Sequence, residues 1–153
     1  MKLVASSIGV ALVLIYVVGS GLWVNTGDGW YRGLNQPSWQ PPDFIFGIIW
    51  PYNFIVLGYA AVIVSNRLGS ALVATYLIVF AISVACALTW AFQFYRPHNL
   101  EAASTALTCV AVLTIALVVI ASRASWPLAF ALMPYQIWVS IASFLSWSYA
   151  RLN

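Results

Sequence analysis

Charged side chains are what this sequence has least of. Lys and Arg number 6, Asp and Glu number 3, and together they make 6% of the 153 residues, while 63% are hydrophobic. A soluble domain usually has about 25% charged residues, which keep its surface hydrated. The shortage excludes a soluble fold and predicts that lipid covers most of the chain. The basic residues give a net charge of +3 but never stand next to one another, so we expect no nucleic-acid partner.

Residues that hydrolytic and metal-dependent enzymes need are also scarce. The chain has one histidine, His98, and its three acids, Asp28, Asp43 and Glu101, are scattered at the ends of hydrophobic runs. No Ser-His-Asp set, carboxylate pair or group of metal ligands can be assembled from them. We therefore expect no metal site and no acid–base catalysis, and we expect His98 to be a hydrated loop residue rather than a haem ligand.

Long hydrophobic runs are what the chain has in place of charge. Five windows of at least about 20 mostly apolar residues contain no Asp, Glu, Lys or Arg, as helices that cross a bilayer require. They are residues 3–24, 44–65, 70–95, 102–121 and 126–149. The first window is longer than the roughly 7–15 apolar residues of a cleaved signal, so we expect it to be retained. The prediction is an all-α, multi-pass integral membrane protein, with residues 1–153 forming one five-helix membrane domain.

The connections set the expected topology. Three of the four are short, so sequential helices are expected to be antiparallel neighbours, and an odd number of spans puts the two termini on opposite sides. The two sides have equal numbers of basic residues: Lys2, Arg67 and Arg123 on one, and Arg32, Arg96 and Arg151 on the other. The positive-inside rule therefore fixes neither the orientation nor the membrane.

The connection at residues 25–43 differs from the others. It is polar and long, and it contains several aromatic and proline residues. Its apolar side chains provide contact surface, and its prolines lower the entropy cost of ordering the backbone. We expect a structured lid between the first two spans, with contacts from Trp30, Tyr31, Leu34 and Trp39.

Aromatic residues are abundant, with 8 Trp, 8 Tyr and 8 Phe. Indole favours the headgroup region of a bilayer, which explains Trp23 and Trp126 at the ends of spans. Trp50 and Trp138 lie about 9 and 18 Å inside their spans, at 1.5 Å per residue, and are too deep for that explanation. Each shares a helical face with small residues, and such a face either packs the bundle or lines a cavity for a flat apolar ligand. The pattern leaves both interpretations open.

Polar residues inside the spans favour a cavity. Such side chains need hydrogen-bond partners in lipid, and they often line the interior of a bundle. They are Asn53, Thr89, Gln93 and Gln136. Pro51 and Pro134 are expected to kink two of the helices.

Two sequence motifs resemble a known family. Residues 30–42 read WYRGLNQPSWQPP and are followed by Phe46, Gly47 and Trp50, while residues 134–145 contain Pro134, Tyr135 and Trp138. This pattern is similar to that of the tryptophan-rich sensory protein family, whose animal members are the translocator protein or peripheral benzodiazepine receptor. The resemblance extends over essentially the whole chain.

The resemblance implies a fold and a function. Family members are bundles of five helices capped by the first loop, often homodimers, which bind tetrapyrroles such as protoporphyrin, sterols in animals, and isoquinoline- or benzodiazepine-type drugs. It therefore implies a membrane receptor or sensor with porphyrin as ligand or substrate and with no other cofactor. The alternative is a transporter of tetrapyrroles or sterol-like lipids.

The resemblance also implies site residues. The pocket would comprise Trp30, Pro41, Trp50, Phe54, Thr89, Trp90, Gln93, Trp138, Ala142 and Ser146, while Arg32 in the lid is placed to pair with ligand carboxylates. Thr89 and Ser146 stand where many members have Asn. Some bacterial members degrade protoporphyrin in light with two tryptophans that correspond to Trp50 and Trp138, which leaves an enzymatic role open.

A sterol-type pattern is present near the C-terminus, formed by Leu145, Tyr149 and Arg151. An arginine that reaches from a helix end to the headgroup region explains Arg151 equally well.

Overall fold

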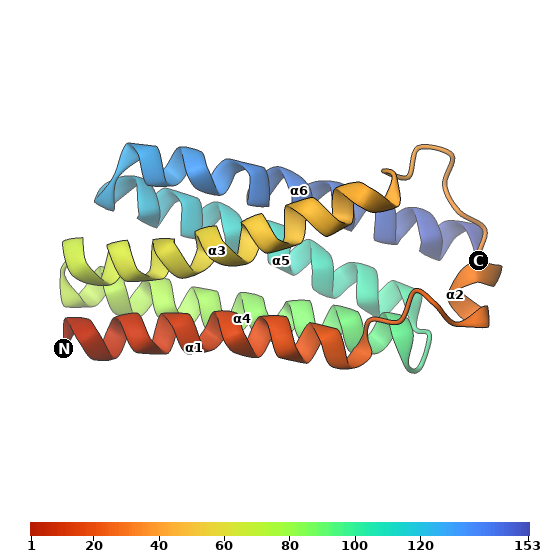
Figure 1. The fold of residues 1–153 in the computed structure, drawn as a ribbon, viewed down its shortest axis with the longest axis horizontal. Helices are drawn as coiled ribbons and strands as arrows, with labels where there is room; N and C mark the ends of the chain where they lie inside the picture. Colours follow the sequence, from red (N-terminus) through yellow and green to blue (C-terminus); the bar gives the residue numbers. More distant parts are fainter.

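Six helices make up the protein, as the computed structural model of residues 1–153 shows (Figure 1). Five are long and apolar enough to cross a membrane: α1 (Lys2–Trp23), α3 (Asp43–Arg67), α4 (Ser70–Tyr95), α5 (Leu100–Ala124) and α6 (Trp126–Leu152). The short α2 (Gly29–Gly33) lies in the first loop. The predicted all-α bundle of five spans is confirmed, and the two termini lie at opposite ends of it (Figure 1).

Local sequence explains where α2 and α5 begin. The Asp28 carboxylate accepts a hydrogen bond from the Tyr31 backbone N–H at 2.8 Å at the start of α2, and Asn99 caps α5 through the Ala102 N–H at 3.1 Å. Each cap satisfies a backbone donor that the first helical turn leaves free. Pro51 lies inside α3 and Pro134 inside α6.

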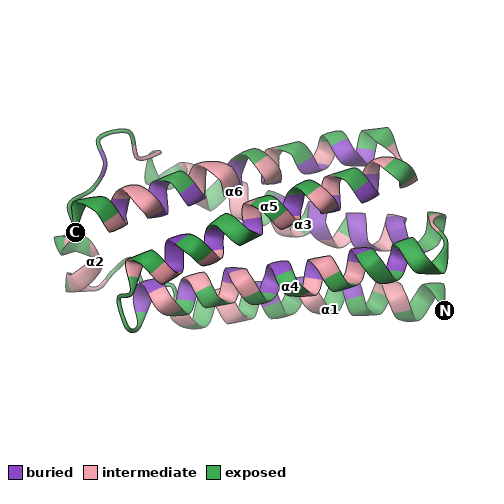
Figure 2. Ribbon diagram, turned by 180° about the vertical axis from the view of Figure 1, so that it is seen from behind, coloured by how far each residue is buried: buried purple, intermediate pink, exposed green.

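The order of packing differs in part from the order in the chain. α5 packs extensively against α4 and α6, its neighbours in sequence. α3 and α4 are joined by a short turn, yet each contacts α1 more than it contacts the other. Buried residues lie mainly on the helix faces that turn toward one another (Figure 2), and they include Leu57, Tyr76 and Tyr135.

Hydrogen bonds reinforce the contact between α5 and α6. The hydroxyl pairs Ser104–Ser146 and Thr108–Ser143 are each 2.9 Å apart. Gln136 donates through Nε2 to the Ala111 carbonyl oxygen at 3.1 Å. Lipid chains are as apolar as leucine, so such bonds and close packing hold membrane helices together.

Gly9 sets how closely α1 approaches α3. A Cβ atom at Gly9 would overlap the Ala61 side chain, whereas a Cβ atom at Gly21, in the same helix, would meet nothing within 4 Å. We expect Gly9→Ala to lower the free energy of unfolding by about 1–3 kcal/mol because the two helices must move apart. Gly21→Ala should instead stabilise α1 by roughly 0.5–1 kcal/mol. Denaturant unfolding in detergent micelles measures both, and equal effects would contradict the close approach.

Candidate functional site

The first loop forms a lid that aromatic contacts hold on the bundle. Trp30 stacks on His98, with ring centroids 3.7 Å apart and 9° between the planes, and its edge contacts Phe94 at 5.7 Å. His98 has φ 59° in the turn between α4 and α5. Its ring is therefore a support for the lid, which the expectation of a merely hydrated histidine overlooked.

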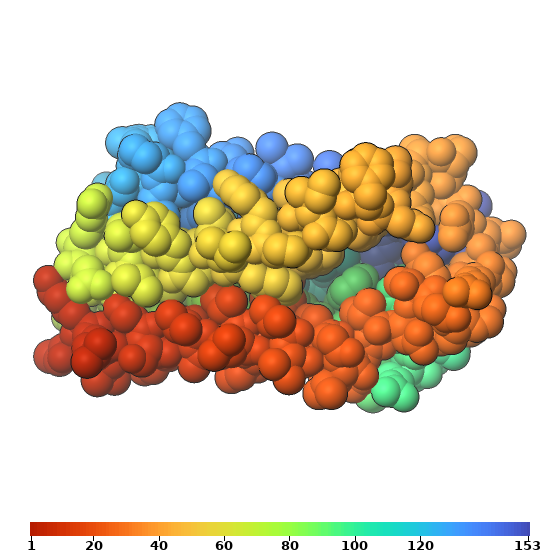
Figure 3. Space-filling model, in the orientation of Figure 1, coloured from red at the N-terminus to blue at the C-terminus, as the bar shows by residue number.

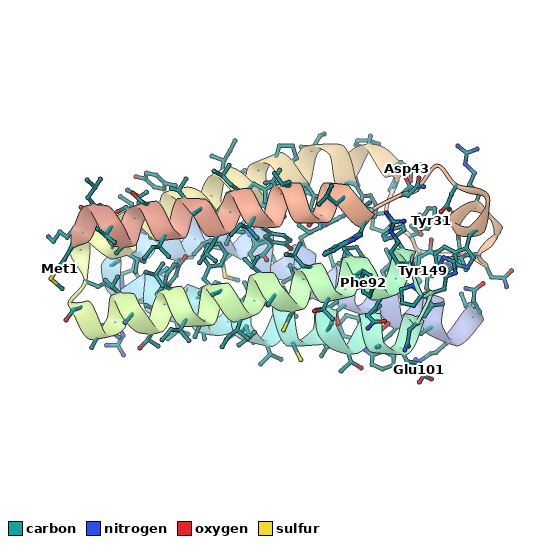
Figure 4. The ribbon with its side chains drawn as sticks, turned by 90° about the horizontal axis from the view of Figure 1, so that it is seen from below. Met1, Tyr31, Asp43, Phe92, Glu101 and Tyr149 are labelled. Carbon is teal, nitrogen blue, oxygen red and sulfur yellow. The ribbon has the colours of Figure 1, made fainter.

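Tyr31 and Tyr149 form the centre of the lid contact. Their rings are 6.1 Å apart and their hydroxyl oxygens 3.5 Å apart, and the Tyr149 hydroxyl donates a hydrogen bond to Gln40 Oε1. Figure 4 shows the two tyrosines together at the end of the bundle opposite Met1. The predicted structured lid is confirmed.

Two asparagines tie the lid to the C-terminal end of α6. The Asn35 backbone N–H donates to Asn153 Oδ1 at 2.8 Å, and the Asn35 side chain donates to the Leu152 carbonyl oxygen at 3.1 Å. Asn153 Nδ2 in turn donates to the Asn35 carbonyl oxygen at 3.2 Å. Trp39, in contrast, is 48% exposed.

The molecular surface is hollowed beneath the lid. Figure 3 shows this hollow between α1 and α3 at the lid end, with atoms of α4 and α6 visible behind it. This depression, the hollow, lies between two spanning helices and so faces the bilayer as well as the lid.

Aromatic side chains of the predicted pocket come from α1, α3 and α6, which border the hollow or lie behind it. Trp50 stacks on Phe54 with centroids 5.6 Å apart, and Tyr16 of α1 contacts both rings edge-on at 6.0 and 5.2 Å. Trp138 of α6 is buried and meets Phe46 of α3 edge-on at 5.0 Å.

Further predicted residues lie on α4, on α6 and in the lid. Trp90 contacts Phe94 at 6.0 Å, the ring that also supports Trp30, so the lid and α4 share one aromatic cluster. Ala142 is half-buried against the core, and Gln93 and Pro41 are half-buried as well.

Other predicted residues lie apart from this group. Thr89 is exposed, and its hydroxyl donates to the Ala85 carbonyl oxygen of its own helix at 2.8 Å. Ser146 is buried against α5 through its bond to Ser104. Arg32 is exposed on α2.

The sterol-type pattern is divided between the inside and the outside of the bundle. Leu145 and Tyr149 are buried, while Arg151 is exposed and borders a surface groove with Phe144 and Trp147. A sterol on the outer surface would therefore meet Arg151 but not Leu145, and sterol binding stays a prediction.

Sequence reasoning missed several contributors to this region. Tyr16 had no signal beyond being a tyrosine in the middle of an apolar span, and Gln40 and Asn35 are ordinary loop residues in the sequence. Asn53 was noted only as a polar residue at membrane depth. It is fully buried, and neither of its amide atoms has a hydrogen-bond partner.

We expect Tyr149→Phe to loosen the lid. The phenyl ring keeps the aromatic contact, but the hydrogen bond to Gln40 is lost, which costs about 1 kcal/mol and should speed amide hydrogen exchange of the lid roughly five-fold. Tyr52→Phe is the matched control, because its hydroxyl bonds to the Ala131 carbonyl oxygen, away from the lid. Unchanged exchange in Tyr149→Phe would show that aromatic packing alone holds the lid.

Comparison with known proteins adds to this geometry. The model of the TspO/MBR family matches residues 7–152. The chain is 29% identical to the tryptophan-rich protein TspO of Bacillus cereus, with 81% of this chain and 80% of that protein aligned. It is 30% identical to protein CrtK of Rhodobacter capsulatus, over 81% and 78% of the two chains. It is 28% identical to the human translocator protein, over 89% and 82%.

Proposed function

The chain belongs to the TspO/MBR family, and from this membership together with the aromatic hollow under the lid we propose that it is a membrane receptor or sensor for a porphyrin-type tetrapyrrole. A protein of Cereibacter sphaeroides to which it is 28% identical has the name tryptophan-rich sensory protein. That name supports a sensory role for this chain.

The observation that carries the proposal is the aromatic group formed by Trp50 and Phe54 of α3 with Tyr16 of α1, the two helices between which the hollow lies. Flat ring systems bind well against such side chains, since stacking adds to the burial of apolar area. Trp138 and Trp90 extend the aromatic surface on α6 and α4. A porphyrin is flat, largely apolar and soluble in the bilayer, which suits a site between spanning helices.

The lid supplies the charge that a porphyrin requires. Arg32 is exposed on α2, next to Tyr31, which anchors the lid on Tyr149. A guanidinium can form paired, charge-assisted hydrogen bonds with a propionate group. In this arrangement the ring lies against the indoles and its carboxylates point toward water.

The resemblance also implies light-dependent porphyrin degradation, transport and a homodimer. Each of these stays a prediction. A photochemical role for Trp50 and Trp138 would need porphyrin to bind first, so binding is the property to test.

We expect Trp50→Ala and Trp138→Ala each to weaken protoporphyrin binding by about 1–3 kcal/mol, the range for losing a stacking wall. Fluorescence titration of the purified protein in darkness measures the affinity. Trp126→Ala is the control, because Trp126 is 69% exposed at the opposite end of the bundle. Similar losses in all three variants would indicate general destabilisation instead of a site.

Arg32→Gln tests the proposed contact with a carboxylate. We expect it to reduce affinity for protoporphyrin about ten-fold, because a hydrogen bond to a charged group contributes about 1.5–3 kcal/mol. The dimethyl ester of protoporphyrin has the same ring without the charge, so its affinity should change little. Equal losses for the acid and the ester would assign Arg32 a structural role in the lid.

A further inference from the structure

The two ends of the bundle differ in charge. Figure 4 shows Asp43 and Glu101 at the lid end, far from Met1. The third acid, Asp28, lies in the lid at the start of α2. Three arginines at the same end balance these acids: Arg32, Arg96 and Arg151. The whole net charge of +3 therefore lies at the opposite end, which has three basic residues and no acid.

The three basic residues at the Met1 end are far apart in the sequence, but they meet where α3 and α5 end. Lys2 of α1 donates through Nζ to the carbonyl oxygen of Asn66, the residue before Arg67, at 2.8 Å. The Arg67 guanidinium donates to the carbonyl oxygen of Ala124, the residue after Arg123, at 3.4 Å. Lys2, Arg67 and Arg123 are all exposed, and together they form the basic cluster.

The basic cluster is unfavourable on its own, because like charges repel one another. The hydrogen bonds to the ends of α3 and α5 offset part of this repulsion, since the C-terminal end of a helix carries a partial negative charge. They do not neutralise it, because a carbonyl group is a dipole and has no net charge. Arg67 uses one N–H group in its bond to Ala124, and its guanidinium has several more that can bind an anion from outside the protein.

The depth of the basic cluster makes the membrane the source of that anion. α3 and α5 are spanning helices, so their ends lie near the headgroup region of a bilayer. Trp126 begins α6 at the same end and is exposed, as is typical of indole side chains at that depth. Phe130 is one turn further into the span and is also exposed, so lipid chains cover this part of α6.

We propose that the basic cluster binds the phosphate group of an anionic phospholipid such as phosphatidylglycerol. Guanidinium groups form strong, charge-assisted hydrogen bonds with phosphate. Phosphatidylcholine has the same phosphate, but it also has a quaternary ammonium group that the cluster repels, so the cluster selects lipids by their net charge. This inference goes beyond the proposed function and does not depend on it, because the cluster lies at the end of the bundle opposite the lid.

The experiment measures the preference of the protein for phosphatidylglycerol over phosphatidylcholine. The protein is extracted from vesicles that contain equal amounts of the two lipids, and native mass spectrometry counts the lipid molecules that stay bound. We expect the unsubstituted protein to retain phosphatidylglycerol, and Arg67→Gln and Arg123→Gln each to lower the preference about five-fold, as expected for one basic residue at a membrane surface. No preference in the unsubstituted protein would overturn the proposal.

Arg67→Lys separates charge from structure. Lysine keeps the positive charge, so this variant should retain more of the preference than Arg67→Gln does. Equal losses in the two variants would show that Arg67 acts only through its bond to the Ala124 carbonyl oxygen, and would remove it from the site.

Arg96→Gln is the matched control. Arg96 is exposed and also donates to a backbone carbonyl oxygen near the end of a neighbouring helix, that of Leu22 in α1, at 3.3 Å. It lies at the lid end, among the acids, so its loss should leave the lipid preference unchanged. A five-fold loss in Arg96→Gln would show that the total charge of the protein selects the lipid, and would overturn the assignment to the cluster.

Fluorescence of Trp126 locates the bound lipid, because it is the only tryptophan at the Met1 end. The signal of Trp126 is the difference between the unsubstituted protein and Trp126→Phe. Phosphatidylglycerol with brominated chains should quench this signal more strongly than brominated phosphatidylcholine at the same mole fraction, and Arg67→Gln should abolish the difference. Equal quenching by the two lipids in the unsubstituted protein would place any bound phosphatidylglycerol elsewhere and would overturn the proposal.

Glycerol 3-phosphate distinguishes a lipid headgroup from a free phosphate, since it has the charged group without acyl chains. It should not displace phosphatidylglycerol when the two are present in equal amounts. Displacement would show that the basic cluster is a site for a water-soluble phosphate, and would overturn the assignment to lipid.

Discussion

Lipid offers a protein no hydrogen bonds, and this one constraint explains most of the structure. Most backbone hydrogen bonds, 106 of 120, lie within the helices, as they must where water is absent. Side-chain hydroxyls follow the same rule: Thr75, Thr105 and Ser148 each donate to a carbonyl oxygen one turn back in their own helix. Against this background of local hydrogen bonding, a few buried groups have no partner, among them the Asn53 carboxamide and the indole N–H groups of Trp90 and Trp138.

The lid follows a different principle because it meets water. It has little regular structure beyond α2, so contacts with the bundle must order it. Aromatic rings provide apolar area, and the Asn35–Asn153 pair satisfies backbone groups of the loop. Contacts with α4 and with the C-terminal end of α6 therefore hold the lid in place.

The sequence predicts some levels of this structure well and others poorly. The spans follow from uncharged apolar length, and their observed ends lie within three residues of the predicted ones. The lid follows from composition, but the Trp30–His98 stack joins residues whose pairing no local pattern encodes. Site residues depend on how each helix is rotated about its axis, which explains why Trp138 is buried beside Phe46 while Thr89 is exposed. A helix face that lines a cavity and one that packs against a neighbouring helix have the same sequence pattern. Ser146 was predicted to line the pocket, but it packs against α5 through its hydrogen bond to Ser104.

The hollow opens between α1 and α3, two helices that face hydrocarbon (Figure 3). A ligand that enters by this side must first dissolve in the bilayer, so its concentration at the opening is set by its partition into lipid and not by its concentration in water. A strongly lipid-soluble compound can therefore occupy a site that is reached through the bilayer even when its contacts with the protein are weak. For the proposed receptor, membrane composition would then act on occupancy directly, since any lipid that changes the partition of the ligand would change how much of it reaches the proposed site at Trp50.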